Sequence, residues 1–96
     1  MANLYYVYIL ECSDKTFYVG MTSDMNKRLT EHQMAKDPTS YTARRLPIHL
    51  VFKAEFTDPL LAMNMEQKIK KWSKAKKLAL INDEFEKLPG LSKKKF

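Results

Sequence analysis

The chain has one cysteine, two glycines and no long hydrophobic run, and each scarcity excludes a class of protein. Because Cys12 has no second cysteine to pair with, an intramolecular disulfide and a cysteine-based metal cluster are both excluded. Gly20 and Gly90 are too few to build a glycine-rich phosphate-binding loop. The apolar run over residues 4–10 is too short to span a bilayer, so we expect a cytoplasmic protein with no membrane partner.

Size and charge indicate one basic globular domain. The chain has 96 residues, of which 45% are hydrophobic, enough for one core. We expect a domain over residues 1–88, followed by a basic, flexible tail over residues 89–96. Seventeen Lys and Arg residues against eleven Asp and Glu residues leave a net charge of +6. This charge favours an anionic partner such as nucleic acid, although a lysine-rich soluble surface explains it equally well.

The order of apolar patterns predicts the fold class. Strand patterns over residues 4–12 and 17–22, separated by turn-forming residues, indicate a β-hairpin. A helix over residues 24–36 and a third strand over residues 48–56 follow, joined by a connection without periodicity. Helices over residues 59–72 and 73–87 complete the order β-β-α-β-α-α. The expected class is α/β, an α+β sandwich in which helices flank a small, three-stranded, mainly antiparallel sheet.

The last two helices each carry an apolar stripe that we expect to face the sheet. The spacing of hydrophobic residues on a helical wheel identifies these stripes. In the first of the two helices the stripe is Leu61, Met65, Ile69 and Trp72, and in the second it is Leu78, Ile81 and Phe85.

Two tripeptides and three later residues give the sequence a family resemblance. Tyr6-Val7-Tyr8 precedes Tyr18-Val19-Gly20, and Tyr18 follows Tyr8 by ten positions. Arg28 and His32 are four residues apart on the first predicted helix, and Glu66 lies on the helix after the third strand. Each of these motifs alone is weak evidence of a family. Together they resemble the motifs of the GIY-YIG nuclease superfamily, over about residues 4–80.

Details within the resemblance point to one branch and show two departures. The loop over residues 41–47 resembles that of small stand-alone bacterial members related to structure-specific resolvase subunits. Tyr6 stands where the first tripeptide would have glycine, and Met21 stands where some relatives have a lysine that could tune Tyr18. Tyr8 and Tyr18 share a face only if even-numbered residues pair across the hairpin, for example Tyr8 with Thr22.

The resemblance implies a divalent-metal-dependent nuclease. Hydrolysis of a phosphodiester needs an attacking water, a proton acceptor and positive charge on the developing phosphorane. By resemblance, Tyr18 accepts the proton or positions the water, Glu66 binds a single Mg²⁺ or Mn²⁺, and Arg28 clamps the phosphate. Tyr8 and His32 would hydrogen-bond the water, the phosphate or Tyr18. A free tyrosine, with a pKa of about 10, is a poor base at neutral pH.

Other basic residues are candidates for nucleic-acid contact. Arg44 and Arg45 suit phosphate, and Tyr41 beside them can stack on a base. A stripe of Lys70, Lys74 and Lys77 would form if one helix ran through Ser73, although a solvated face is equally plausible.

Three functions are consistent with these observations. The first is an endonuclease on DNA, in repair or recombination, acting on branched or damaged substrates, with RNA as an alternative and a protein partner supplying specificity. The second is a nucleic-acid-binding module with the same fold and no turnover. The third is a small interaction domain, in which the tyrosines fill a core, His32 and His49 are surface residues and Glu66 forms a salt bridge.

Overall fold

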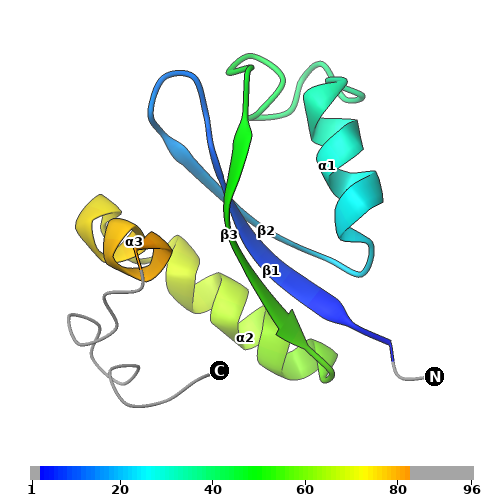
Figure 1. The fold of residues 1–96 in the computed structure, drawn as a ribbon, viewed down its shortest axis with the longest axis vertical. Coiled ribbons are helices and arrows are strands. Elements are labelled where there is room, and N and C mark those ends of the chain that lie inside the picture. Colours follow the sequence, from blue (N-terminus) through cyan, green and yellow to red (C-terminus); the bar gives the residue numbers. More distant parts are fainter. Residues whose placement is uncertain (1–2, 83–96) are drawn as a thin grey trace.

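The computed structural model describes residues 3–82, and its elements follow the predicted order (Figure 1). Within this range the predicted fold class, an α+β fold of three strands and three helices, is confirmed. None of the described helices is long and apolar enough to cross a membrane. The elements are β1 (Tyr5–Glu11), β2 (Phe17–Thr22), α1 (Met25–Gln33), β3 (His49–Phe56), α2 (Pro59–Lys70) and α3 (Lys74–Ile81).

The sheet has β1 in the centre, and both neighbours pair with it antiparallel in the order β2-β1-β3. Val7, Tyr8, Ile9 and Leu10 of this strand are all fully buried. A strand that is covered on both faces needs apolar side chains on both alternating sets, which explains its nearly unbroken hydrophobic sequence.

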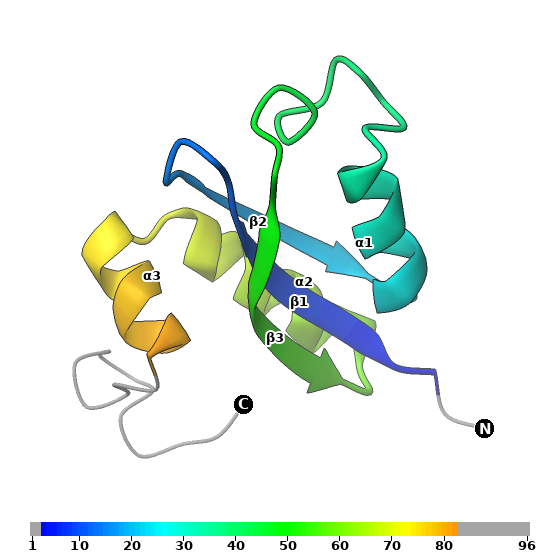
Figure 2. The same ribbon diagram turned by 45° about the horizontal axis from the view of Figure 1, so that its top comes forward.

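Different helices cover the two faces of the sheet. Val7 and Ile9 pack in one core with Ala62 and Ile69 of α2 and with Leu80 of α3. Tyr8, Leu10 and Met25, the first residue of α1, form a second core on the opposite face. In Figure 2, α1 lies on one side of the strands and α2 behind them.

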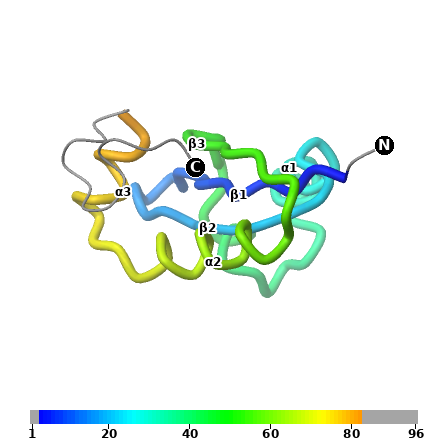
Figure 3. Tube along the Cα trace, turned by 90° about the horizontal axis from the view of Figure 1, so that it is seen from below, coloured from blue at the N-terminus to red at the C-terminus, as the bar shows by residue number. Residues whose placement is uncertain are grey.

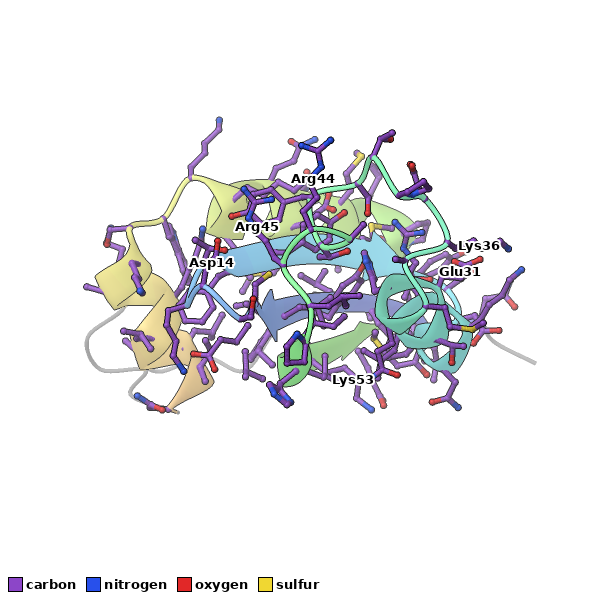
Figure 4. The ribbon with its side chains drawn as sticks, turned by 90° about the horizontal axis from the view of Figure 1, so that it is seen from above. Asp14, Glu31, Lys36, Arg44, Arg45 and Lys53 are labelled. Atoms are coloured by element: carbon purple, nitrogen blue, oxygen red, sulfur yellow. The ribbon has the colours of Figure 1, made fainter. Side chains whose placement is uncertain are left out.

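The position of α2 brings it next to an edge strand. Figures 3 and 4 both place α2 beside β2, with β3 on the far side of the sheet. Residues of α2 contact β2 as well as β1 and β3. A side chain of α2 can therefore reach the same edge of the sheet as side chains on the α1 face.

The register of the hairpin places the two tyrosines of interest on one face. Even-numbered residues pair with even-numbered residues, as expected, since Leu10 lies opposite Tyr18. The example pairing of Tyr8 with Thr22 is wrong by two residues, because Tyr8 pairs with Gly20. The loop over residues 12–16 sets this register. It also has an odd number of residues, but it is longer than the loop over residues 14–16 that the pairing of Tyr8 with Thr22 implies.

The predicted helices are longer than the observed ones. The helix expected over residues 24–36 ends at Gln33, because Met34 caps it and Ala35 adopts a positive φ of 51° that a helix cannot continue. The helix expected to reach residue 72 ends at Lys70. The third strand begins one residue later than predicted, at His49.

Two residues of the predicted apolar stripes do not face the sheet. Leu61 is 57% exposed and Leu78 is 39% exposed, so both assignments are wrong. The small side chains of Ala62 and Ala79 are buried in their place, which lets each helix backbone approach the strands closely. The prediction from helical periodicity relied on the large leucine side chains and overlooked the small alanine side chains that face the sheet.

The predicted lysine stripe also fails, because the helix on which it depended is interrupted. Helix α2 ends at Lys70, and Ser73 begins a new helix by accepting from the backbone N–H of Lys76. Lys70 and Lys74 therefore lie on different helices. Phe85, the end of the helix predicted to reach residue 87 and the tail over residues 89–96 lie outside the described residues.

Gly20 is required by its neighbour across the hairpin. A Cβ atom built on Gly20 would overlap the Tyr8 hydroxyl and the ring carbon that bears it. The Tyr8 ring thus lies directly over the glycine, and any larger side chain must displace it.

We predict that Gly20→Ala destabilises the protein by about 1–3 kcal/mol, the usual cost of overpacking a core. The melting temperature should fall by roughly 4–8 °C for each kcal/mol in a domain of this size. Thermal unfolding of Gly20→Ala, Tyr8→Leu and the double variant measures the coupling. Purely additive losses would contradict a direct clash with the ring and hydroxyl of Tyr8.

Candidate active site

The hydroxyl of Tyr8 is the centre of a buried polar cluster. Tyr8 has no solvent exposure, and burial of a hydroxyl requires hydrogen bonds in place of water. Its oxygen lies 3.0 Å from His32 Nε2 and accepts a longer bond, 3.4 Å, from Arg28 Nε. The central strand and the first helix are thereby joined through three of the predicted site residues.

Helix α1 delivers Arg28 and His32 to the same point. Their four-residue spacing puts them one turn apart on one face. Asp24 begins the helix by accepting from the backbone N–H of Lys27, which fixes where that face points. His32 is 6% exposed, so the reading of this histidine as a surface residue is wrong.

Tyr18 completes an aromatic cluster above β1 and β2. Its ring centroid is 5.1 Å from that of His32 and 6.4 Å from that of Tyr8. The ring centroid of Tyr41, from the loop before β3, is 6.0 Å from that of Tyr18. Tyr18 is half-buried whereas Tyr8 is fully buried, so Tyr18 is the more accessible of the two phenols.

The surroundings keep two of these groups in their neutral forms. Burial raises the pKa of Tyr8 above its ordinary value, while the hydrogen bond from Arg28 acts in the opposite direction. Burial lowers the pKa of His32, and the nearby charge of Arg28 lowers it further. At neutral pH we therefore expect a protonated Tyr8 and an uncharged His32.

Glu66 lies on α2 and acts on the cluster through its charge. Its negative charge contributes to the raised pKa of Tyr8, although it is the smallest of the five causes. The Glu66 side chain is 17% exposed, and one carboxylate oxygen lies 3.5 Å from Lys70 Nζ. Within the described residues no group of three or more His, Cys, Asp or Glu side chains could hold a metal ion.

A hollow adjoins the positively charged side of the cluster. A cavity of about 300 Å³ is lined by residues of α1 and the following loop, including Arg28 and His32. A larger hollow of about 550 Å³ lies along the outer side of α1 and contains none of the aromatic side chains. Of these two hollows only the smaller is lined by Arg28 and His32, and neither is lined by Tyr8 or Tyr18.

The two loop arginines have different structural roles. The Arg45 guanidinium lies 3.8 Å over the centre of the Tyr41 ring and forms an ion pair of 3.1 Å with Asp14. It also donates to the backbone carbonyl of Tyr41 at 2.8 Å. In Figure 4, Arg45 and Asp14 lie close together, with Arg44 nearby. Arg44 is exposed and makes no ion pair with any described residue.

Two contributors escaped prediction from the sequence. Thr42, 1% exposed, lies 2.7 Å from His32 Nδ1 through its hydroxyl. Glu31 forms an ion pair of 3.4 Å with Arg28. A lone threonine in a loop carries no periodic signal, whereas the three-residue spacing of Arg28 and Glu31 could have indicated their pairing.

We predict that the free energy of unfolding falls as the pH drops below about 6.5. The unfolded chain takes up a proton on His32 near that pH, and the folded chain resists it, so stability is present above this range and is lost below it. Denaturant unfolding between about pH 7.5 and 5.5 measures the effect. His32→Gln should lack this component, and His49→Gln, at an exposed position, should retain it. An unchanged pH dependence in His32→Gln would contradict the assignment.

Comparison with known proteins agrees with this arrangement. A family model described as the GIY-YIG catalytic domain matches residues 4–79. A UPF0213 protein of Syntrophus aciditrophicus is 48% identical over 84 residues, covering 86% of this chain and 95% of that protein. A UPF0213 protein of Natronomonas pharaonis is 42% identical over 84 residues, covering 88% and 98%. The solution NMR structure of a UPF0213 protein from Bacillus halodurans is 38% identical, covers 82% and 83% of the two chains, and has a TM-score of 0.55. The chain therefore belongs to the GIY-YIG family of nuclease domains.

Proposed function

We propose that this protein is a divalent-metal-dependent endonuclease that hydrolyses phosphodiester bonds in DNA. The observation that carries the proposal is the joining of Tyr8, His32 and Arg28 by hydrogen bonds beside Tyr18. A cationic side chain next to two phenols suits a reaction in which negative charge grows on a phosphate. Family membership supports a nucleic-acid substrate.

Each side chain has a role that follows from its position. Arg28 is 41% exposed and borders the hollow, so its guanidinium can bind a phosphate while its Nε donates to Tyr8. Tyr18, the more accessible phenol, accepts the proton of the attacking water or positions that water. Tyr8 and His32 are buried behind it and hold Arg28 and Tyr18 in place.

The proposed metal is Mg²⁺ or Mn²⁺ bound through Glu66. A single carboxylate fits these cations, because they retain several of their own waters when bound. The partly buried carboxylate lies close enough to affect Tyr8, which suits a ligand at the edge of the cluster. When bound, such an ion supplies positive charge to the phosphate and the departing oxygen.

One observation favours the second candidate, a nucleic-acid-binding module without turnover. Lys70 already pairs with the Glu66 carboxylate, so a cation must compete with an ammonium group for this ligand. An ion pair with an exposed lysine is weak, about 0–1 kcal/mol, which is too little to prevent metal binding. The endonuclease therefore remains the better supported function.

We predict that the purified protein cleaves DNA in the presence of Mg²⁺ or Mn²⁺ and that a chelator abolishes cleavage. Linear, branched, damaged and single-stranded substrates, with RNA as a further arm, should be compared. Tyr18→Phe and Glu66→Ala should each reduce the cleavage rate by at least about 10²-fold, because each removes a group that acts on the reacting atoms.

Glu55→Ala is a matched control for Glu66→Ala, because it removes a carboxylate by the same substitution. Glu55 is exposed on β3, the strand on the far side of the sheet from α2, and this variant should cleave at the wild-type rate. Cleavage by Tyr18→Phe or Glu66→Ala at the wild-type rate would disprove the mechanism. Salt-dependent binding of DNA without metal-dependent cleavage would instead support the binding module, and no binding at all would favour an interaction domain.

We propose further that Tyr41, Arg44 and Arg45 form a nucleic-acid contact beside the site. Because Arg44 is exposed, Arg44→Ala should weaken DNA binding, reduce its salt dependence and leave the melting temperature unchanged. Arg45→Ala should lower the melting temperature as well, since it removes the contacts to Asp14 and Tyr41. Fluorescence anisotropy across a salt series, together with thermal unfolding, separates the two effects. Unchanged affinity in the double variant Arg44→Ala/Arg45→Ala would exclude this surface.

A further inference from the structure

His32 is bound at both ring nitrogens by hydroxyl groups. Thr42 Oγ1 lies 2.7 Å from Nδ1, and Tyr8 Oη lies 3.0 Å from Nε2. Thr42 is 1% exposed, Tyr8 is 0% exposed and His32 is 6% exposed. A hydroxyl can donate or accept, so a neutral imidazole between two of them has two possible tautomers. Because solvent scarcely reaches these three side chains, the hydrogen bonds among them must determine which tautomer of His32 is present.

The two distances favour one arrangement of hydrogens. A hydroxyl donor gives shorter hydrogen bonds than an N–H donor: O–H···O bonds are typically about 2.7–2.8 Å long and N–H···O bonds about 2.9–3.0 Å. The shorter contact therefore fits Thr42 O–H donating to Nδ1 of His32. The longer contact fits the imidazole Nε2–H donating to Tyr8.

The contact from Arg28 is consistent with this arrangement. Arg28 Nε has a hydrogen to donate and no lone pair, so the Tyr8 oxygen must be the acceptor of their 3.4 Å bond. With a second N–H arriving from His32, both lone pairs of the Tyr8 oxygen are used. The hydroxyl hydrogen of Tyr8 is then directed away from His32.

The loop that carries Thr42 is fixed to the hairpin. The backbone N–H of Ser13 donates to the carbonyl of Arg45 at 2.9 Å, and the backbone N–H of Arg45 donates to the carbonyl of Thr42 at 3.0 Å. The ion pair between Arg45 and Asp14 adds a side-chain link between the same two segments. Thr42 is thus held at a defined position behind the imidazole, as a group that selects a tautomer must be.

We propose that Thr42 is a positioning residue that holds His32 as the Nε2–H tautomer, so that His32 and Arg28 both donate to Tyr8. Two donors on one phenol oxygen fix the orientation of the Tyr8 ring. The benefit of this arrangement to cleavage rests on the proposed nuclease function. The tautomer itself is a property of the folded protein and is testable without any substrate.

The experiment is long-range ¹⁵N–¹H correlation NMR of the histidine side chains at about pH 8, where histidine is neutral. The spectrum distinguishes protonated from unprotonated ring nitrogens, and His49→Gln identifies which signals belong to His32. In the wild-type protein we expect a protonated Nε2 and an unprotonated Nδ1. Thr42→Ser keeps the hydroxyl and should preserve this pattern. Thr42→Val removes the donor at nearly constant volume, and the Nδ1–H tautomer should become populated.

Two results would overturn the proposal. One is a wild-type spectrum with the proton on Nδ1, which needs no variant and therefore no assumption about folding. The other is a Thr42→Val spectrum identical to that of the wild type. A parallel cleavage assay separates this proposal from the nuclease function: with the Nε2–H tautomer present and no cleavage under any condition, the assignment of Thr42 stands and the endonuclease does not.

Discussion

The structure depends on satisfying one phenol hydroxyl in a place that water does not reach. Tyr8 lies on the central strand, fully buried, and an unpaired hydroxyl there would cost about 1–3 kcal/mol. Its partners come from one turn of α1, and one of them, His32, depends in turn on Thr42. A single buried oxygen thus ties a strand, a helix and a loop together, and the same contacts assemble the candidate site.

The sequence was sufficient to predict the order of elements and, through the family resemblance, four residues of this cluster: Tyr8, Tyr18, Arg28 and His32. The hydrophobic run of β1 and the turn residues after it carry strong local signals, and the spacing of Arg28 and His32 follows directly from helix geometry. Even the parity of the hairpin register could be argued in advance, since only one parity allows Tyr8 and Tyr18 to share a face.

Other features could not be predicted because they depend on long-range packing. The exposure of Leu61 and the burial of Ala62 reflect how closely α2 approaches the sheet, which no helical wheel contains. The pairing of Tyr8 with Gly20 depends on a loop length that the turn residues did not define. The contact between Thr42 and His32 joins an irregular loop to a helix, so neither periodicity nor propensity could indicate it.

The candidate site draws its groups from both sides of the sheet, and this has a consequence for the order in which the protein matures during synthesis. The phenols, the guanidinium and the imidazole lie within the first 32 residues, whereas the carboxylate of Glu66 arrives with a helix that packs against the opposite face. A nascent chain that has not yet closed α2 over β2 lacks the ligand proposed for the cation. Under the proposed function, metal-dependent cleavage would therefore require the completed tertiary structure.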